Sequence, residues 1–220
     1  MTWLYLVAAT AFCLAPLATA LPAPAEVLTV ISSIAEQTDV PNLVSGVILH
    51  TRLYDTVAEV VVFTLASIGV RFLFAGEPAK ASVRALEDPP SVVLCQLSGT
   101  IAALIGVELA LRGHLSPGGG FAAGVAGGTA IGLALISGSA SLSDRLYSRY
   151  RADLWEKAAV IAFVLLAALA LWGVPLPLGG RFGSLASGAW IPLLNVLVAI
   201  KVTLGSWAMV QLFVRHRGLL

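Results

Sequence analysis

Six long stretches with few charges constrain this chain more than any other feature of its sequence. A helix needs about 20 mainly apolar residues to cross the hydrocarbon core of a bilayer. Segments of that kind lie at residues 2–21, 54–74, 91–111, 119–138, 156–174 and 190–213. Charged residues make up only 11% of the chain, whereas soluble domains carry about a quarter. We therefore expect an all-α, polytopic integral membrane protein with about six transmembrane helices.

The first apolar segment has two interpretations. Residues 2–21 end near an A-x-A-like site at Ala18–Ala20, as a cleaved signal peptide does. However, no Lys or Arg precedes Arg52, so the basic region of a signal peptide is missing. We expect a retained transmembrane helix.

Composition argues against several other functions. The formal net charge of +1 gives no indication of nucleic-acid binding. Cys13 and Cys95 lie in apolar runs, and no disulfide framework or metal-ligand spacing can be built from them. We expect no cofactor, no metal site and no enzymatic activity.

Polar residues divide the chain into two parts. Residues 77–90 (EPAKASVRALEDPP) are expected to be a linker between a two-helix segment at 1–76 and a four-helix domain at 91–220. Residues 22–40 have mixed polarity and are expected to form a short helix at the membrane interface. The Gly- and Ala-rich segment 119–138 favours close packing against other helices.

Basic residues predict the orientation in the membrane, because cytoplasmic loops carry an excess of Lys and Arg. With six spans, one side of the membrane holds nine basic residues: Arg71, Lys80, Arg84, Arg145, Arg149, Arg151, Lys157, Arg215 and Arg217. The other side holds only Arg52, Arg112 and Arg181. We therefore expect both termini in the cytoplasm.

A glycine run, RGHLSPGGGFAAGVAGG at 112–128, raises the question of phosphate binding. A phosphate-binding loop needs a preceding strand and a Lys after the glycines, and neither is present here. The run therefore predicts a tight turn in which Pro117 ends one conformation and the glycines allow close backbone approach.

Ionisable residues inside membrane spans are costly, so each is a candidate functional residue. Asp55 and Glu59 lie four residues apart on one face of the second predicted helix and would suit a proton or sodium relay. Alternatively, Asp55 caps the helix at the interface and Glu59 is satisfied by a neighbouring helix.

Three further residues are candidates. Glu108 has Arg112 at the spacing of a local ion pair, so it serves either an ion path or simple pairing. His114 either shuttles protons or anchors a loop. Lys201 has about ten apolar residues on each side, so it should be paired, deprotonated or adjacent to a hydrated cavity.

Two of these stretches resemble one family. RGHLSPGGGF resembles the G-H-x-x-P-G-G-G-F signature of the MnhB subunit of Mrp-type (Mnh) sodium/proton antiporters. PLLNVLVAIKVTLG at 192–205 is similar to that family's P-x-x-N-x-x-V-x-x-K-V segment. Residues 41–70 are similar to the E subunit of membrane-bound hydrogenases, with a D-T-x-x-E core. In Mrp antiporters the equivalent segment ends the large MnhA subunit.

The resemblance implies a non-catalytic subunit of a hetero-oligomeric complex in the plasma membrane, with Na+ and H+ as transported ions. The positions that match the family motifs are Asp55, Glu59, His114, Pro117, Gly118, Gly119, Gly120, Phe121, Asn195 and Lys201. We hypothesise that Glu59, together with Asp55, exchanges a proton or sodium ion while Lys201 supplies a counter-charge. Two alternatives remain: a subunit of a hydrogenase or other ferredoxin-linked complex, and a purely structural scaffold.

Overall fold

The computed structural model describes residues 24–80, 83, 85–176 and 179–218, with the single positions 3, 7, 10 and 14. Most of the predicted first helix, 2–21, lies outside the described residues. Over the described ranges the chain is helical and contains no strand. The elements are α2 (Pro24–Thr38), α3 (Leu43–Gly46), the π-helical turn η1 (Val47–Thr51), α4 (Leu53–Leu73), α5 (Pro89–Arg112), α6 (Gly120–Ala134), the π-helical turn η2 (Leu135–Ser139), α7 (Ala140–Arg149), α8 (Ala152–Leu171) and α9 (Trp190–Arg217).

The predicted fold class is confirmed. Within the described residues, five helices are long and apolar enough to cross a membrane: Leu53–Leu73, Pro89–Arg112, Gly120–Gly138, Ala152–Leu171 and Trp190–Arg217. They correspond to five of the six predicted spans. The start of α8 shifts by four residues, because the helix begins at Ala152 rather than at residue 156. Glu156 therefore lies one turn inside the helix rather than at its end.

Local signals account for the start of α5. Asp88 precedes the helix, and its carboxylate accepts hydrogen bonds from the Ser91 backbone N–H (3.1 Å) and the Ser91 hydroxyl (2.6 Å). Pro89 and Pro90 occupy the first turn, where the missing N–H groups need no intrahelical acceptor.

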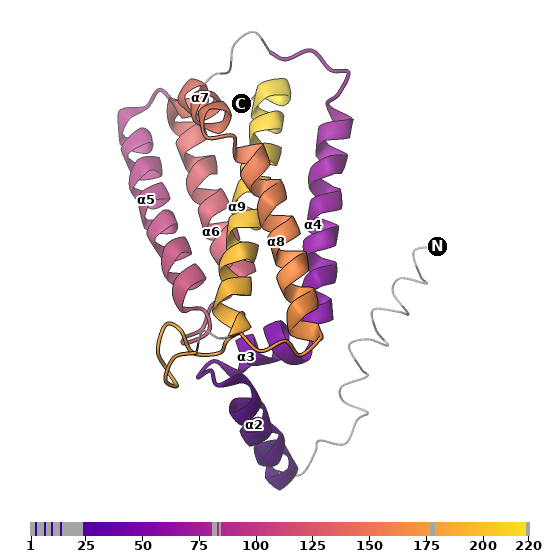
Figure 1. Cartoon of the computed structure of the whole chain (residues 1–220). Coiled ribbons are helices and arrows are strands. Elements are labelled where there is room, and N and C mark those ends of the chain that lie inside the picture. The colour runs from indigo at the N-terminus through magenta and orange to yellow at the C-terminus, as the bar shows by residue number, and fades with distance from the viewer. Residues whose placement is uncertain are drawn as a thin grey trace.

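Helix α9 is the centre of the bundle and packs against α4, α5, α6 and α8 (Figure 1). Its 28 residues make it the longest helix of the described chain. At about 1.5 Å per residue it exceeds the roughly 30 Å of a bilayer hydrocarbon core.

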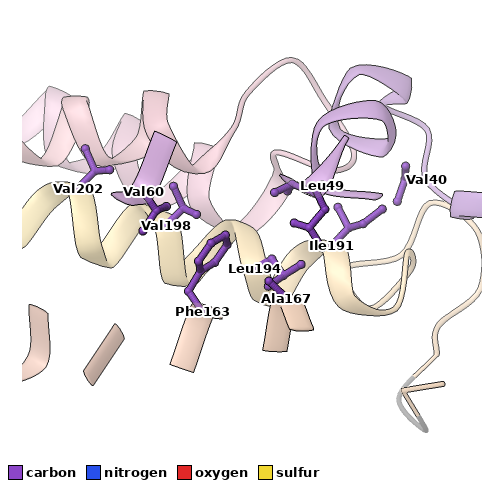
Figure 2. Close-up of a cluster of buried hydrophobic side chains, with 10 residues drawn as sticks. Val40, Leu49, Val60, Phe163, Ala167, Ile191, Leu194, Val198 and Val202 are labelled. Carbon is purple, nitrogen blue, oxygen red and sulfur yellow. The ribbon is translucent and has the colours of Figure 1, made fainter. Parts of the chain in front are cut away.

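One apolar core joins the predicted front and back parts of the chain. Val60 of α4 lies with Phe163 of α8 and with Leu194, Val198 and Val202 of α9 (Figure 2). The remaining members are Val40, Leu49, Leu53, Ala167 and Ile191. The described part of the predicted front segment, which ends in α4, therefore packs in the same core as α8 and α9.

Small residues bring α5, α6 and α9 close together, as the sequence predicted. A Cβ atom added to Gly106 of α5 would lie 3.0 Å from the Ala123 carbonyl oxygen of α6. A Cβ atom added to Gly124 would overlap the side chain of Val202 and lie 3.1 Å from the Ala199 carbonyl oxygen, both in α9. Any larger side chain at these positions would push the helices apart.

The two ends of the bundle differ. One end carries α7 and the end of α9, and the other carries α3, the turn at 113–119 and the segments 172–176 and 179–189 (Figure 1). The linker residues Glu77 and Lys80 bind the first of these ends: Glu77 pairs with Arg217 at 2.9 Å, and the Lys80 backbone N–H donates to the Arg215 carbonyl at 2.9 Å. Below, these are called the α7 end and the α3 end.

Candidate ion-path site

A buried ion network lies between α4, α8 and α9. The Lys201 ammonium of α9 lies 2.5 Å from Oε1 of Glu156 in α8, and Nη2 of Arg71 in α4 lies 3.0 Å from Oε2 of the same carboxylate. Lys201 is 1% exposed and Glu156 is 4% exposed. Thus Lys201 has a buried partner, and that partner is Glu156 rather than Glu59 or Asp55.

Aromatic and glycine residues complete the surroundings of Lys201. Its ammonium lies 5.1 Å from the centroid of the Phe63 ring, within the range of a cation–π attraction. A Cβ atom at Gly205 would lie 2.7 Å from Cε1 of Phe63 and 3.2 Å from both Nζ of Lys201 and Oε1 of Glu156. Only glycine at 205 therefore permits this close arrangement.

The network adjoins a cavity of about 300 Å³, named here the Lys201 cavity. Its walls are mainly apolar, with Ile68, Val160 and Ile161, and its polar lining residues include Thr64, Ser67, Arg71, Glu156 and Lys201. Two cationic side chains share one carboxylate, so the cluster has a formal charge of +1. Charges inside a membrane protein are costly unless paired or hydrated, so this is the most demanding electrostatic site in the described structure.

A second cavity, the Arg215 cavity, opens at the α7 end. It has a volume of about 330 Å³, and its lining includes Arg71, Tyr147, Gln211 and Arg215. Burial raises the pKa of the Tyr147 phenol, and the nearby positive charge of Arg71 acts in the opposite direction. Tyr147 therefore stays a neutral phenol at physiological pH. Arg71 lines both this cavity and the Lys201 cavity.

A third cavity, the Glu59 cavity, lies near the α3 end. It measures about 470 Å³ and is lined by residues that include Thr56, Glu59, Gly119, Gly120 and Asn195. Glu59 is exposed on the surface of the single chain and has no ion pair with a described residue.

Asn195 ties α9 to the end of α5. Its Nδ2 donates to the carbonyl oxygens of Leu109 (3.2 Å) and Ala110 (2.7 Å), which lie in the last turn of α5. Its Oδ1 is buried and has no hydrogen-bond partner among the described residues.

Asp55 and Glu108 make local contacts. Asp55 lies in the first turn of α4 and pairs with Arg52 at 2.5 Å, with about half of its side chain exposed. Glu108 pairs with Arg112 at 2.9 Å, also exposed, so the predicted i,i+4 contact is present. The structure does not bring either residue to Lys201.

The glycine motif forms a turn between α5 and α6. Pro117 and Gly118 are exposed, and Phe121 packs against the apolar core. A Cβ atom on Gly120 would lie 2.5 Å from the Asn195 carbonyl oxygen, whereas one on Gly119 would have no neighbour within 4 Å. Among the three consecutive glycines 118–120, the closest approach is therefore at Gly120, and Gly113 at the start of the turn is similarly close to the Leu109 carbonyl oxygen, at 2.6 Å from an added Cβ.

His114 holds this turn from inside. It is fully buried, and its Nε2 lies 3.4 Å from the Ser184 carbonyl oxygen. Asn42 stabilises the same turn, because its Nδ2 donates hydrogen bonds to the carbonyl oxygens of Gly113 (2.7 Å) and Ser116 (2.8 Å). Burial lowers the pKa of His114, outweighing the opposite effect of its backbone hydrogen bonds.

We expect acidification to destabilise the protein through His114. Its pKa is lowered in the folded state, so the unfolded state binds more protons as the pH falls through and below about 6.5. The contribution of neutral His114 to the free energy of unfolding is thus fully present above that pH and is lost as the pH falls below it. His114→Gln should flatten the decline in thermal stability of the purified complex between about pH 7 and pH 5. An unchanged decline would show that His114 is not its source.

Sequence reasoning missed Glu156 and Arg71. In the sequence Glu156 is only the first residue of a predicted span, and Arg71 is one of nine basic residues that predict the orientation in the membrane. The signal available was the charge of Lys201, for which a buried counter-charge was one of three possibilities, together with the Glu156 carboxylate at the edge of an apolar run. No group of three or more His, Cys, Asp or Glu side chains in the described parts of the chain could hold a metal ion.

Known structures share this fold. The chain is similar to a chain of the membrane-bound sulfane sulfur reductase, an archaeal respiratory membrane complex, with a TM-score of 0.73 and 23% identity over 97% of this chain and 95% of the other. It is also similar to a chain of the Mrp complex from Dietzia sp. DQ12-45-1b, with a TM-score of 0.69 and 19% identity. That match covers 98% of this chain but only 25% of the Dietzia chain.

The amino-acid sequence also identifies the family of this chain. Curated protein sequences give no significant match. The family described as "Domain related to MnhB subunit of Na+/H+ antiporter" matches residues 90–208, which is more than half of the chain. These residues contain α5 except its first residue, α6 to α8 and most of α9, including Glu156 and Lys201. The chain therefore belongs to the family of membrane domains related to the MnhB subunit of Na+/H+ antiporters.

Proposed function

We propose that this chain is a membrane subunit of a multi-subunit, Mrp-type monovalent cation/proton antiporter and contributes to its ion path. The buried Arg71–Glu156–Lys201 network beside a cavity, in a chain of this family, carries the proposal. We propose Na+ and H+ as the transported ions and the plasma membrane as the location. The nine-to-three distribution of basic residues supports cytoplasmic termini and a cytoplasmic α7 end.

The charge arrangement suggests how the site couples two ions. A monovalent cation that reaches Glu156 would compete with the Lys201 ammonium for the same carboxylate. Release of one proton from Lys201 would then leave the net charge of the cluster unchanged. In this mechanism Arg71 keeps Glu156 in place during the exchange, and Glu59 is a cation or proton acceptor toward the α3 end.

The exposed surface supports partner subunits in the bilayer. Helices α4 and α5 expose many large apolar side chains, among them Val62, Leu65, Leu97 and Leu104. In a membrane these faces contact lipid or other transmembrane helices. We propose that the other subunits of the complex cover part of them.

The alternative function is membership of a redox-driven membrane complex, and one structural similarity favours it. The similarity to the sulfane sulfur reductase chain extends over nearly the whole of both chains. A redox-driven relative, such as a hydrogenase or another ferredoxin-linked complex, is therefore the alternative. Purification of the intact complex decides between them, because co-purifying iron–sulfur subunits would identify the redox-driven type.

The proposed function is tested by neutralising the buried pair. We expect Lys201→Met/Glu156→Gln to assemble normally and to lower cation/proton antiport at least about tenfold, equivalent to about 1.4 kcal/mol. Arg71 is more than one third exposed, so it can be hydrated when Glu156 is neutral.

The matched control is Asp153→Asn, which neutralises an exposed carboxylate on the same helix. Its partner Lys157, 3.6 Å away, is 64% exposed and stays hydrated. Antiport in vesicles should be unchanged in this control. Full antiport activity in the Lys201/Glu156 double variant would instead support a structural scaffold.

A further inference from the structure

The three cavities follow one another along a single helix. Thr56 and Glu59 of α4 line the Glu59 cavity, Thr64 and Ser67 line the Lys201 cavity, and Arg71 is shared with the Arg215 cavity. These residues recur every three to five positions, so they lie along one side of α4. Helix α4 runs from the α3 end to the α7 end (Figure 1). It therefore carries a polar stripe from one end of the bundle to the other.

This stripe is interrupted once. Residues 60–63 of α4 are Val-Val-Val-Phe, and they separate Glu59 from Thr64. Val60 is 1% exposed and packs in the core with Val198 and Val202 of α9, each also 1% exposed. An apolar layer thus lies between the Glu59 cavity and the Lys201 cavity.

Phe63 is the member of this layer that contacts the charged network. Its ring is half-buried, lies 5.1 Å from the Lys201 ammonium and rests against the backbone of Gly205. A ring attracted to a cation loses that attraction when the cation becomes neutral. The position of Phe63 is therefore linked to the charge of Lys201, which distinguishes it from the valines.

We propose that Phe63 is the barrier between two aqueous half-paths and that its contact with Lys201 couples this barrier to the proton on the lysine. One half-path ends at Glu59 and opens toward the α3 end. The other runs from the α7 end through the Arg215 cavity, past Arg71, to Lys201 and Glu156. This inference rests on the proposed function and names the residue that keeps transport coupled.

The barrier is tested by the accessibility of single cysteines in the intact complex. Cys13 and Cys95 are first replaced by Ser, and then Glu59→Cys or Thr64→Cys is added. A membrane-impermeant, cationic thiol reagent is applied to right-side-out and to inside-out vesicles. We expect the cysteine at 59 to react only from the α3 side and the cysteine at 64 only from the α7 side.

Truncation of the ring should remove this sidedness. With Phe63→Ala, each cysteine should react from the opposite side at least about ten times faster than with Phe63 intact. The matched control is Phe72→Ala, because Phe72 lies on the same helix with 83% of its surface exposed and should leave the sidedness unchanged. If Phe63→Ala fails to assemble, Phe63→Val makes the same comparison with a smaller truncation.

Either of two results would overturn the inference: reaction of both cysteines from the same side with Phe63 intact, or retention of full sidedness after truncation. Labelling requires no transport. The sidedness therefore tests the barrier even if Lys201→Met/Glu156→Gln transports normally, in which case the proposed function fails and the barrier remains.

Discussion

Glu156→Gln is expected to destabilise the protein far more than Lys201→Met. Removing the carboxylate leaves the Lys201 ammonium, 1% exposed, without its anionic partner, a change that typically costs about 3–5 kcal/mol. Removing the lysine charge instead leaves Glu156 paired with Arg71 at 3.0 Å. The carboxylate then keeps a counter-charge, so the loss in Lys201→Met should be clearly smaller.

The double variant makes this expectation quantitative. Lys201→Met/Glu156→Gln has no unpaired buried charge and should recover most of the stability lost in Glu156→Gln. The measurement is the thermal midpoint of the purified complex and the fraction of this chain found in it. Equal losses in the two single variants would contradict the shared-carboxylate geometry. The exposed variant Asp153→Asn serves as the control for removal of a carboxylate from α8.

Gly124→Val is expected to give the second large effect, by separating α6 from α9. The new side chain would overlap Val202 and approach the Ala199 carbonyl oxygen, 3.1 Å from the added Cβ. Because that oxygen belongs to the backbone of α9, a rotamer change cannot relieve the contact. Overpacking of this kind costs about 1–3 kcal/mol, and assembly of the complex should fall with it.

The control for this change lies on the same helix. A Cβ atom added to Gly132 meets nothing within 4 Å, so Gly132→Val should leave assembly nearly unchanged. The measurement is the amount of intact complex recovered after detergent extraction. Similar losses in both variants would show that helix propensity, rather than packing against α9, is responsible.

Span positions were accessible from the sequence because hydropathy is a local property. Five of the predicted spans match helices of the structure, and their ends shift by only a few residues. That small shift mattered at α8, where four additional residues place Glu156 inside the helix. The side on which Glu156 then lies could not be predicted, because α8 is apolar around its circumference and gives no periodic signal.

The contacts of the turn around the glycine motif could not be predicted from the sequence either. Its glycines and proline predicted a turn, and the chain forms one between α5 and α6. The residues that hold it come from elsewhere: Asn42 lies more than 70 positions away from the carbonyls it binds. Asn195 binds the end of α5 across 85 positions. No local pattern encodes such partners.

By itself, the sequence determined that the chain is a helical membrane protein with a lysine inside an apolar span, because these properties depend on residues that are adjacent in the chain. Only the tertiary structure decided what that lysine does. Lys201 meets Glu156 across 45 positions, and Glu156 meets Arg71 across 85. The packing of α4 and α8 against α9 sets these contacts, and Gly205 allows them, so the network exists only in the folded bundle.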